Sequence, residues 1–550
     1  MCAPVATQTS LTGKRWVARG GLPLASLRHT HGTKIAAEIA RERGIEEDGE
    51  VVRIPAPPDL ARAVKRAHKA ANDGEQVGVF GDYDCDGITA AAQMVRYFRR
   101  SGREPLVRLP HRAHDGYGLT TSIAEEWIAR GITVLITVDT GVTAVAPIAL
   151  LKEKGIDVIV VDHHHLPEEL PPAYAILHPG LTPRFAHPHP SGSGMAFLFL
   201  RGLEGEVWED MHTDRALAMM GTVADLVELR GINRQLVTSG LRSLRELRSG
   251  PLAELRDEVA SGMLTSTDVA FRIAPRLNAA GRMDDPMLAL HALLEGGGHM
   301  TRLHALNRER QEVTARLVEK ARRDTAHVLT VLKASASKEY PHGIIGLMAG
   351  SLTESTGCPS MVGAVHGDRI TASLRSPRNY HVTEGLSRIG HLLESFGGHS
   401  QAAGCSFPAV RWREVCESLE RDILRMQSAG DFLPTIEVDA LLSEEDVSLQ
   451  LAQSLMRLEP FGQGNPEPRF LLRGVTVRET RRVGEDAKHL QMDISGVRAI
   501  GFGLGAAQER IAGPVDAVCR VGINAWQGKR SVQLVVEDIA TRDEQREARK

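Results

Sequence analysis

The sequence predicts an α/β protein: a doubly wound parallel sheet, a long connecting helix, a smaller α/β unit and a small C-terminal β-barrel. Three observations predict this fold class. Apolar strand patterns alternate with helix patterns between residues 77 and 203, which is typical of a doubly wound sheet. Glycine-rich segments at 342–350 and 397–404 lie beside apolar runs and mark a second unit. Short apolar runs separated by turn residues fill the last hundred positions, which indicates a small barrel or sandwich.

The elements of the first unit follow in chain order. Helices are expected at 35–44 and 58–71, then a strand at 77–80, a helix at 89–101, a strand at 133–138, a helix at 145–154, a strand at 157–161 and a helical run at 195–203. The interval 201–323 is predicted to be mostly helical, with amphipathic segments at 214–227, 233–248 and 300–323. The last segment is long and charged, so it is predicted to connect two domains, with a solvated helix face as the alternative.

The second unit is expected at 326–426 and the third at 462–543. Strands of the third unit are predicted at 470–472, 474–477, 490–494, 499–502, 516–523 and 532–536. The domain boundaries that follow are an N-terminal segment at 1–50, a first domain at 51–300, a connecting helix at 301–325, a second domain at 326–430, and a linker with the barrel at 431–550.

Composition indicates a globular protein of a reducing compartment. The 550 residues suffice for about three or four domains. The net charge of −3 neither favours nor excludes a polyanion, and only 4% of residues are aromatic, which argues against a surface that stacks many bases. Six cysteines are scattered without a CxxC pair, which argues against a zinc site or a disulfide framework. With neither a signal peptide nor a membrane-length apolar run, we expect a cytoplasmic protein.

Three acids follow the strand expected at 77–80. Asp82, Asp84 and Asp86 are spaced two apart in VGVFGDYDCDG, and they lie just past the carboxyl end of the strand, where open parallel sheets bind ligands. Carboxylates this close repel one another unless a cation compensates them, and oxygen ligands suit magnesium or manganese. The alternative is an ordinary polar turn in which Gly87 adopts a positive φ.

Acids and imidazoles also follow two further strands. Strand 133–138 ends in Asp139, strand 157–161 ends in Asp162, His163, His164 and His165, and Asp225 interrupts an apolar helical stretch. Taken singly, these residues have ordinary alternatives: a helix cap for Asp139 or Asp162, a surface turn for the histidines, and a satisfied core acid for Asp225. Parallel strands would, however, bring Asp84, Asp86, Asp139 and His163 to one edge of one sheet. The conjunction predicts a metal site.

The motifs GDYDCDG, VDTG, DHHH and GTVADL resemble, in this order, the four motifs of the DHH phosphoesterase superfamily. GGHSQAAG resembles the signature of its associated DHHA1 domain. The further segments PHRAHDGYGL, FRIAPRLNAAGRMDDP, LNRERQ and LEPFGQGNPEP resemble the RecJ family of bacterial single-strand-specific 5′→3′ DNA exonucleases. This resemblance extends from Lys14 onward and implies a DHH domain, a DHHA1 domain and a C-terminal OB-fold. It also implies a role in DNA repair and recombination.

The resemblance implies two Mn²⁺ or Mg²⁺ ions. Asp84 and Asp139 would hold one ion, with Asp139 bridging to a second ion. Asp86, His163 and Asp225 would hold that second ion, while His164 would lie outside the ligand set, toward the scissile phosphate. Many relatives carry a histidine four residues before the first acid, where this chain has Phe80. Asp82 or water would replace that ligand.

The resemblance also implies how a 5′ end is recognised. Ser373, Arg375 and Arg282 would grip the terminal phosphate, and Gly397, Gly398 and His399 of the GGH segment would let the DNA backbone approach closely. Arg112 would contact a neighbouring phosphate. The alternatives are inter-domain salt bridges for Arg282 and Arg375, and a plain helix surface for the basic stretch around Arg112. A channel that admits one strand would exclude a duplex.

The third unit would guide the single strand. Arginine and lysine side chains would line a groove, and Trp526 would stack on a base. The basic candidates are Arg473, Arg478, Arg481, Arg482, Lys488, Lys529 and Arg530. The alternative is a structural cap with solvated arginines.

The implied partners of a monomeric enzyme are single-stranded DNA, single-strand-binding protein and a repair helicase, and the implied products are 5′-mononucleotides. Two other functions compete: a phosphodiesterase of short oligonucleotides or cyclic dinucleotides, and a non-catalytic DNA-binding scaffold. The C-terminal barrel argues against the first. The intact set of acids and histidines argues against the second.

Overall fold

The structure, a computed structural model, describes residues 10–28, 31–45, 55–112, 115–116, 118–185, 187–205, 211–260, 262–325, 329–427, 432–511, 513–526 and 529–541. The chain divides into two compact units. One comprises residues 48–312 with 459–466, and the other comprises 1–47, 313–458 and 467–550. In the described part of the chain, no helix is long and apolar enough to cross a membrane.

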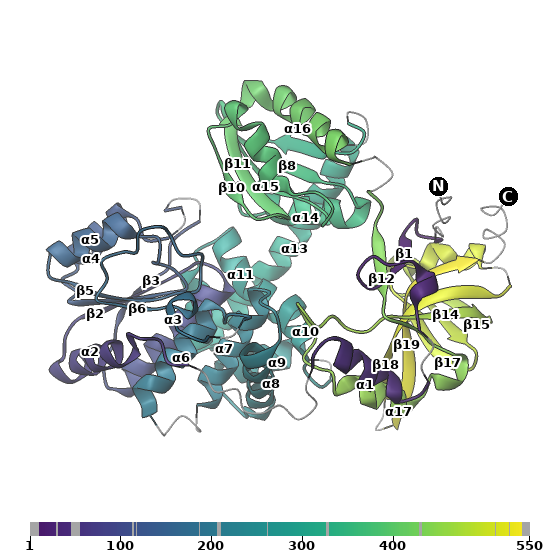
Figure 1. Ribbon diagram of the computed structural model, residues 1–550, viewed down its shortest axis with the longest axis horizontal. Coiled ribbons are helices and arrows are strands. Elements are labelled where there is room, and N and C mark those ends of the chain that lie inside the picture. Colours follow the sequence, from purple (N-terminus) through teal and green to yellow (C-terminus); the bar gives the residue numbers. More distant parts are fainter. Residues whose placement is uncertain are drawn as a thin grey trace. The chain divides into compact units, whose positions relative to one another are not determined.

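The first unit is built on a five-stranded sheet in which every pair of neighbours is parallel (Figure 1). Its strands, in spatial order, are β3 (Leu106–Arg108), β2 (Val77–Gly81), β4 (Val134–Val138), β5 (Asp157–Val161) and β6 (Ala175–Leu177). The three strands predicted from apolar runs are therefore adjacent. β3 and β6 are only three residues long, too short to give a recognisable apolar run.

Helices cover both faces of this sheet, as the alternating pattern predicted. Val134 and Ile136 of β4 pack into a core with α2 (Leu60–Asp73), α3 (Cys85–Arg100) and α6 (Gly192–Glu204). Leu135 points the other way, into a core with α4 (Thr121–Ala129) and α5 (Val145–Glu153). Figure 1 shows α4 and α5 on the side of the sheet opposite to α2 and α6. Because successive residues of a strand face opposite ways, β4 contributes to both cores.

The remainder of the first unit is helical, as predicted. It contains α7 (His212–Ala224), α8 (Gly231–Glu246), α9 (Pro251–Val259), α10 (Ser266–Asp268), a π-helical turn at Val269–Ile273, α11 (Ala274–Met283) and α12 (Met287–Glu295). The predicted connecting helix is α13 (Gly297–Thr325). Residues 459–466 also belong to this unit: the Leu229 amide donates to the Gln463 carbonyl at 2.8 Å.

The second unit contains the smaller α/β region. Its five-stranded sheet has the order β10 (Ser395–Gly398), β11 (Ala402–Pro408), β9 (Arg369–Arg375), β8 (Ser360–His366) and β7 (Lys333–Ser337). Only β7 and β8 pair in parallel. The helices of this region are α14 (Ile345–Thr356), α15 (Val382–Arg388) and α16 (Trp412–Met426).

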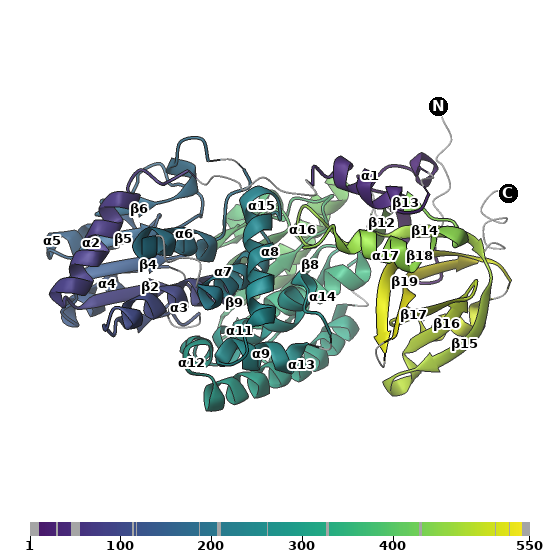
Figure 2. The same cartoon turned by 90° about the horizontal axis from the view of Figure 1, so that it is seen from below.

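The C-terminal region is a seven-stranded sheet (Figure 2). It lacks one predicted strand and contains two strands that were not predicted. Its order is β13 (Ala440–Leu441), β14 (Phe470–Val475), β18 (Val515–Trp526), β19 (Lys529–Thr541), β17 (Val497–Gly501), β16 (His489–Ile494) and β15 (Val477–Val483). The strand predicted at 474–477 is wrong, because β14 ends and β15 begins within it. β15, VRETRRV, has no buried residue, so apolar alternation gives no signal for it. A short helix, α17 (Leu449–Met456), precedes β14.

The N-terminal segment pairs with a strand near the C-terminal region, which the sequence did not indicate. β1 (Arg15–Ala18) runs parallel to β12 (Thr435–Val438), and the Trp16 indole donates to Asp538 at 2.8 Å. The predicted helix at 35–44 is α1 (Lys34–Glu42). The domain boundaries given above remain a prediction. The five described cysteines are buried and carry free thiols.

Asp439 joins this segment to the C-terminal region. Its carboxylate accepts hydrogen bonds from Arg19 Nη2 at 2.9 Å, from Arg43 Nη2 at 2.7 Å and from the Arg469 amide at 2.9 Å. The Arg43 and Asp439 side chains are 6% and 5% exposed. Burial opposes ionisation of Asp439, but its hydrogen bond to Arg19 and the charges of Arg19 and Arg43 outweigh burial and lower its pKa.

We predict that Asp439→Asn lowers the free energy of unfolding by about 3–5 kcal/mol at pH 7, because Arg43 keeps a buried charge without its counter-charge. Since the pKa of Asp439 is lower when folded, its contribution is complete above the unfolded pKa of about 4 and is lost as pH falls through the folded pKa. Urea unfolding from pH 7 to pH 3 measures both effects.

The matched control is Glu42→Gln, since Glu42 meets Arg28 at 3.7 Å on the surface. This change should alter stability by less than about 1 kcal/mol. An Asp439→Asn protein as stable as the Glu42→Gln protein would contradict the prediction.

Candidate metal centre

The predicted metal ligands meet where the strand order of the first unit reverses. From β2 the chain continues to β3 on one side, and β4, β5 and β6 add on the other side. Such switch points open a crevice at the carboxyl ends of the strands. Asp82, Asp84 and Asp86 follow β2, Asp139 follows β4, and His163 follows β5 by two residues.

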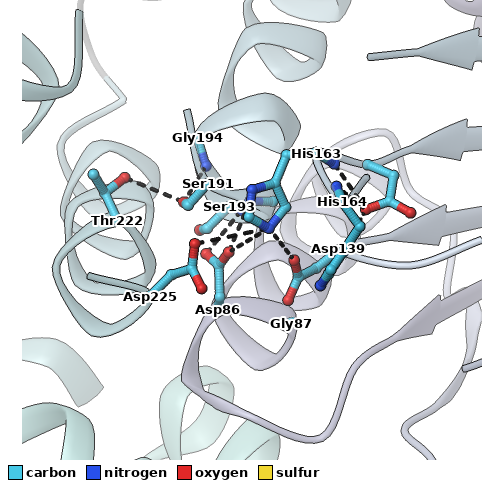
Figure 3. A network of polar contacts seen from close by, with 12 residues as sticks. Asp86, Gly87, Asp139, His163, His164, Ser191, Ser193, Gly194, Thr222 and Asp225 are labelled. Carbon is cyan, nitrogen blue, oxygen red and sulfur yellow. Dashed lines mark hydrogen bonds and ion pairs between the residues drawn. The ribbon is translucent and has the colours of Figure 1, made fainter. Parts of the chain in front are cut away.

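Asp84 and Asp86 are fixed by backbone amides. Asp84 caps α3 and accepts from the amides of Asp86 at 3.0 Å and Gly87 at 3.2 Å. Asp86 accepts from the amides of Gly192 at 2.7 Å and Ser193 at 2.9 Å. These two amides lie at the N-terminus of α6, whose dipole favours a carboxylate. Figure 3 shows the Asp86 carboxylate beside both Ser193 of this helix end and His163.

Three glycines make this arrangement sterically possible. Gly87 does not have the positive φ of the turn alternative. It is required because a Cβ there would lie 2.4 Å from the Asp82 amide nitrogen. A Cβ at Gly192 would lie 2.3 Å from Asp139 Oδ1, and one at Gly221 would lie 2.3 Å from Asp86 Oδ1. The roles of Gly192 and Gly221 escaped the sequence analysis, because only the folded chain brings them against these acids.

His163 stands at the centre of the cluster (Figure 3). Its Nε2 lies 3.1 Å from Asp139 Oδ1, 3.8 Å from Asp225 Oδ2 and 3.9 Å from Asp86 Oδ2. Asp139 has φ of 58°, a left-handed conformation that aspartate tolerates better than most residues. Asp225 is the C-cap of α7 rather than an acid within a helix.

Asp162 orients the histidine pair, a role that the sequence analysis missed. It is 1% exposed, and it accepts from the Val142 amide at 2.9 Å, the His163 amide at 2.7 Å and His164 Nδ1 at 2.8 Å. Burial opposes ionisation, but the hydrogen bond and charge of His164 lower the pKa of Asp162 to about 2. Burial likewise opposes protonation of His164, yet Asp162 raises the pKa of His164 to about 9. The position of Asp162 directly before His163 and His164 was the sequence feature that could have indicated this role.

Four of the five acids predicted as metal ligands, Asp82, Asp86, Asp139 and Asp225, are only partly compensated by the protein. Burial, followed by the charge of Asp84, raises the pKa of Asp82 to about 8 and that of Asp86 to about 6. Burial and the charge of Asp86 raise the pKa of Asp225 to about 8 and that of Asp139 well above its usual value. Burial, and then the charge of His164, lowers the pKa of His163 to about 4, so its imidazole is neutral, as a metal ligand requires.

The residues present fit divalent metal ions. Asp86, His163 and Asp225 place one ligand atom each within 4.8 Å of one another, and so do Asp82, Asp84 and Asp139. Asp139 Oδ1 and His163 Nε2 are buried and have no hydrogen-bond partner in the described part of the chain. Mostly carboxylate oxygens with one imidazole suit Mn²⁺ or Mg²⁺. Asp139, His163 and His164 form a third such set, although His164 is predicted to lie outside the ligands. The division of ligands between two ions therefore stays a prediction.

Other predicted residues near the acids differ in their surroundings. Phe80 is fully buried in the core beside α4 and α5, and His165 is exposed. Arg112 lies over the ring of Tyr83, with its Cζ 4.3 Å from the ring centroid. Arg282 lies near the end of α11.

The basic stretch before Arg112 fits the helix-surface alternative. Each of its arginines binds a carboxylate or a carbonyl: Arg96 meets Asp214, Arg99 meets Glu104, Arg100 meets Glu204, Arg103 meets the Ala71 carbonyl and Arg108 meets Asp115.

The predicted phosphate residues of the second unit share one sheet face. Arg375 Nη1 donates to Ser373 Oγ at 3.1 Å. Ser373 of β9, Gly404 of β11 and Gly397 of β10 occupy one row across the strands, so bare backbone lies beside these two side chains. The His399 amide donates to the Ala402 carbonyl at 2.8 Å. Gly398, which precedes His399, has φ of 138°.

The residues predicted to line the barrel groove are placed only in part. Arg481 donates to Gln491 at 3.2 Å, and Arg482 pairs with Glu509 at 2.7 Å. Both arginines lie on β15. The side chain of Trp526 lies outside the described residues.

We predict that millimolar Mn²⁺ raises the unfolding midpoint of the protein by several degrees, since binding at about 100 times Kd adds ~2.7 kcal/mol. Asp139→Asn should abolish this shift, and it should not lower the midpoint measured in EDTA because it removes an uncompensated buried charge. Thermal unfolding with and without Mn²⁺ measures both quantities. An unchanged Mn²⁺ shift in the variant would show that the ion binds elsewhere.

We predict that Gly221→Ala weakens Mn²⁺ binding by about 10- to 100-fold, because the new Cβ displaces the Asp86 carboxylate. Titration calorimetry measures the affinity. Gly350→Ala is the matched control: both glycines lie inside helices, where alanine is favoured by about 1 kcal/mol, but nothing lies within 4 Å of a Cβ at Gly350. Equal Mn²⁺ affinities in the two variants would contradict the assigned role of Gly221.

Three regions of the chain match known domain families. Residues 76–227 match the DHH family N-terminal domain, residues 325–424 match the DHHA1 domain, and residues 438–538 match the RecJ OB domain. The first match contains the metal centre, and the third confirms the predicted OB-fold.

Curated relatives and solved structures agree with these matches. The chain is 33% identical to the single-stranded-DNA-specific exonuclease RecJ of Thermus thermophilus over 87% of this chain and 71% of the relative. It is 31% identical to the Bacillus subtilis RecJ over 88% of this chain, but it spans only 63% of that relative. Crystal structures of Thermus thermophilus RecJ in complex with Mn²⁺ and with Mg²⁺ match with TM-scores of 0.82 and 0.76. Their identities are 29% and 28%, over 96% of this chain and 80% and 78% of theirs. The chain therefore belongs to the RecJ family.

Proposed function

We propose that this protein is a single-stranded-DNA-specific exonuclease that begins at a 5′ end and releases 5′-mononucleotides, in DNA repair and recombination. The observation that carries the proposal is the pair of ligand sets around Asp139 and His163 in a chain of the RecJ family. The alternative without catalysis would not need uncompensated carboxylates, whose burial costs stability unless cations bind them.

The proposed ligands divide as in the sequence analysis. Asp84 and Asp139, with Asp82, would hold one ion, while Asp86, His163 and Asp225 would hold the other, and Asp139 would be shared. Bound Mn²⁺ or Mg²⁺ ions activate water and stabilise the charge that develops on the phosphate. The Gly192 and Ser193 amides hold the Asp86 carboxylate in one orientation.

His164 is the proposed proton donor. Its Nδ1 is engaged by Asp162 at 2.8 Å, so Nε2 is the atom from which it would donate to the leaving oxygen or to the developing charge. The raised pKa of His164 keeps this imidazole protonated near neutral pH.

The 5′ polarity is proposed to come from phosphate recognition. Arg282, Ser373 and Arg375 are the proposed contacts of the terminal phosphate, and Arg112 is the proposed contact of a neighbouring one. An arginine binds phosphate bidentately, and glycine backbone as at Gly397 permits close approach of a DNA strand.

The cellular setting extends this proposal. Free buried cysteines suit a reducing compartment, so we propose that the protein is cytoplasmic. We also propose that it acts as a monomer. Single-strand-binding protein and a repair helicase are the proposed partners.

Single-stranded DNA labelled at either end, with Mn²⁺, tests the proposal. We predict stepwise release of mononucleotides from the 5′ end, none from blunt duplex, and a loss of at least about 1,000-fold in rate for Asp139→Ala, because a shared ligand of both ions is removed. Gel analysis of the two labels measures the rate and the polarity together.

Other outcomes have definite meanings. Release from the 3′ end would overturn the polarity. Hydrolysis of dinucleotides without cleavage of bound long DNA would identify the small-substrate phosphodiesterase. Binding without any cleavage would identify the scaffold.

A further inference from the structure

Tyr83 has no role in the proposed chemistry, although it lies between Asp82 and Asp84. Its ring is half-buried, and the Arg112 guanidinium lies over it at 4.3 Å. A guanidinium is attracted to the face of an aromatic ring and stacks on it in a planar arrangement. Tyr83 therefore links the acid motif to a predicted phosphate contact.

Arg112 differs from the arginines that precede it in the chain. Arg96, Arg100 and Arg108 are each paired with carboxylates. Arg112 forms no ion pair with any residue that the structure describes, and its buried Nε has no hydrogen-bond partner there. The charge of Arg112 favours ionisation of Asp82, but no acid that the structure describes lies within ion-pair distance of the guanidinium. The Tyr83 ring covers one face of that guanidinium.

Hydrogen bonds hold the backbone around Tyr83. The Tyr83 amide donates to Asp82 Oδ1 at 2.7 Å, and the amide of Cys85, two residues further on, donates to Asn278 of α11 at 2.8 Å. A Cβ at Gly281 of α11 would lie 2.8 Å from the Tyr83 carbonyl oxygen. The backbone that carries the ring is thus held against α11 beside the metal centre, and α11 also carries Arg282.

We propose that Tyr83 is a positioning residue for the substrate: its ring holds the Arg112 guanidinium ready for a phosphate of the bound single strand. This inference rests on the proposed nuclease function. An arginine held in one orientation loses less rotamer freedom when it binds. Removing the ring therefore weakens binding of single-stranded DNA and leaves the chemical step and the metal ions unaffected.

Steady-state kinetics on 5′-phosphorylated single-stranded DNA with Mn²⁺ tests the assignment. We predict that Tyr83→Leu raises KM roughly 3- to 30-fold, with kcat and the half-saturating Mn²⁺ concentration unchanged. Tyr83→Phe keeps the ring and should stay within about twofold of the wild type. Tyr174→Leu, which removes a ring that Arg62 covers at 5.1 Å, is the control and should leave KM unchanged.

A double-mutant cycle shows whether Tyr83 acts through Arg112. Arg112→Ala should raise KM by itself, and adding Tyr83→Leu to it should cause no further rise. Multiplied effects of the two changes would overturn the proposal. A Tyr83→Phe protein as impaired as Tyr83→Leu would also overturn it, since the hydroxyl and not the ring would then matter. So would a Tyr83→Leu protein that needs more Mn²⁺, since the residue would then support the metal ligands.

Binding separates this proposal from the proposed function. Fluorescence anisotropy with labelled single-stranded DNA in EDTA gives Kd without cleavage. A weaker Kd for Tyr83→Leu, with a normal Kd for Tyr83→Phe, supports the positioning role even if the wild type cleaves nothing. A wild type that cleaves DNA, with Tyr83→Leu equal to it in Kd and KM, would reject the positioning role alone.

Discussion

Repulsion among closely spaced carboxylates at one edge of the first sheet is the constraint on which the site depends. Asp82, Asp86, Asp139 and Asp225 all have raised pKa values, so the fold gathers charges that it does not neutralise. Amides of α6 hold Asp86, and glycines let neighbouring backbone approach. The fold thus maintains an arrangement that is unfavourable without cations, and metal binding restores the lost stability.

Much of this site was predictable, because parallel strands bring their carboxyl ends to one edge and strand ends are readable from apolar runs. Asp84, Asp86, Asp139 and His163 follow from that rule. The roles of Asp162, Gly192 and Gly221 do not follow from it, because these roles depend on distances between elements far apart in the sequence. Asp225 was expected within a helix and instead ends one, a boundary that apolar periodicity does not define.

Two further kinds of feature could not be predicted from the sequence: strands without an apolar face, and pairings between distant segments. β15 presents polar side chains on both faces, and β1 is a four-residue strand whose partner is β12. In the basic stretch around Arg100, by contrast, the sequence suggests a feature that the structure does not support. A run of arginines is compatible with a nucleic-acid surface, yet acids dispersed over residues 104–214 neutralise most of it. Arg112, which follows this stretch, lies over the ring of Tyr83.

The pairing of β1 with β12 has a consequence for biosynthesis. Arg15 and Thr435 are partners in the register, so hundreds of residues must leave the ribosome before β1 can pair. At typical rates of ~5–20 residues per second, this delay amounts to roughly 20–80 s. Meanwhile the strand edge and Trp16 have no native partner, and such exposed edges are prone to aggregation. Closing so long a stretch of chain is also slow, so β1 stays unpaired until well after its own synthesis.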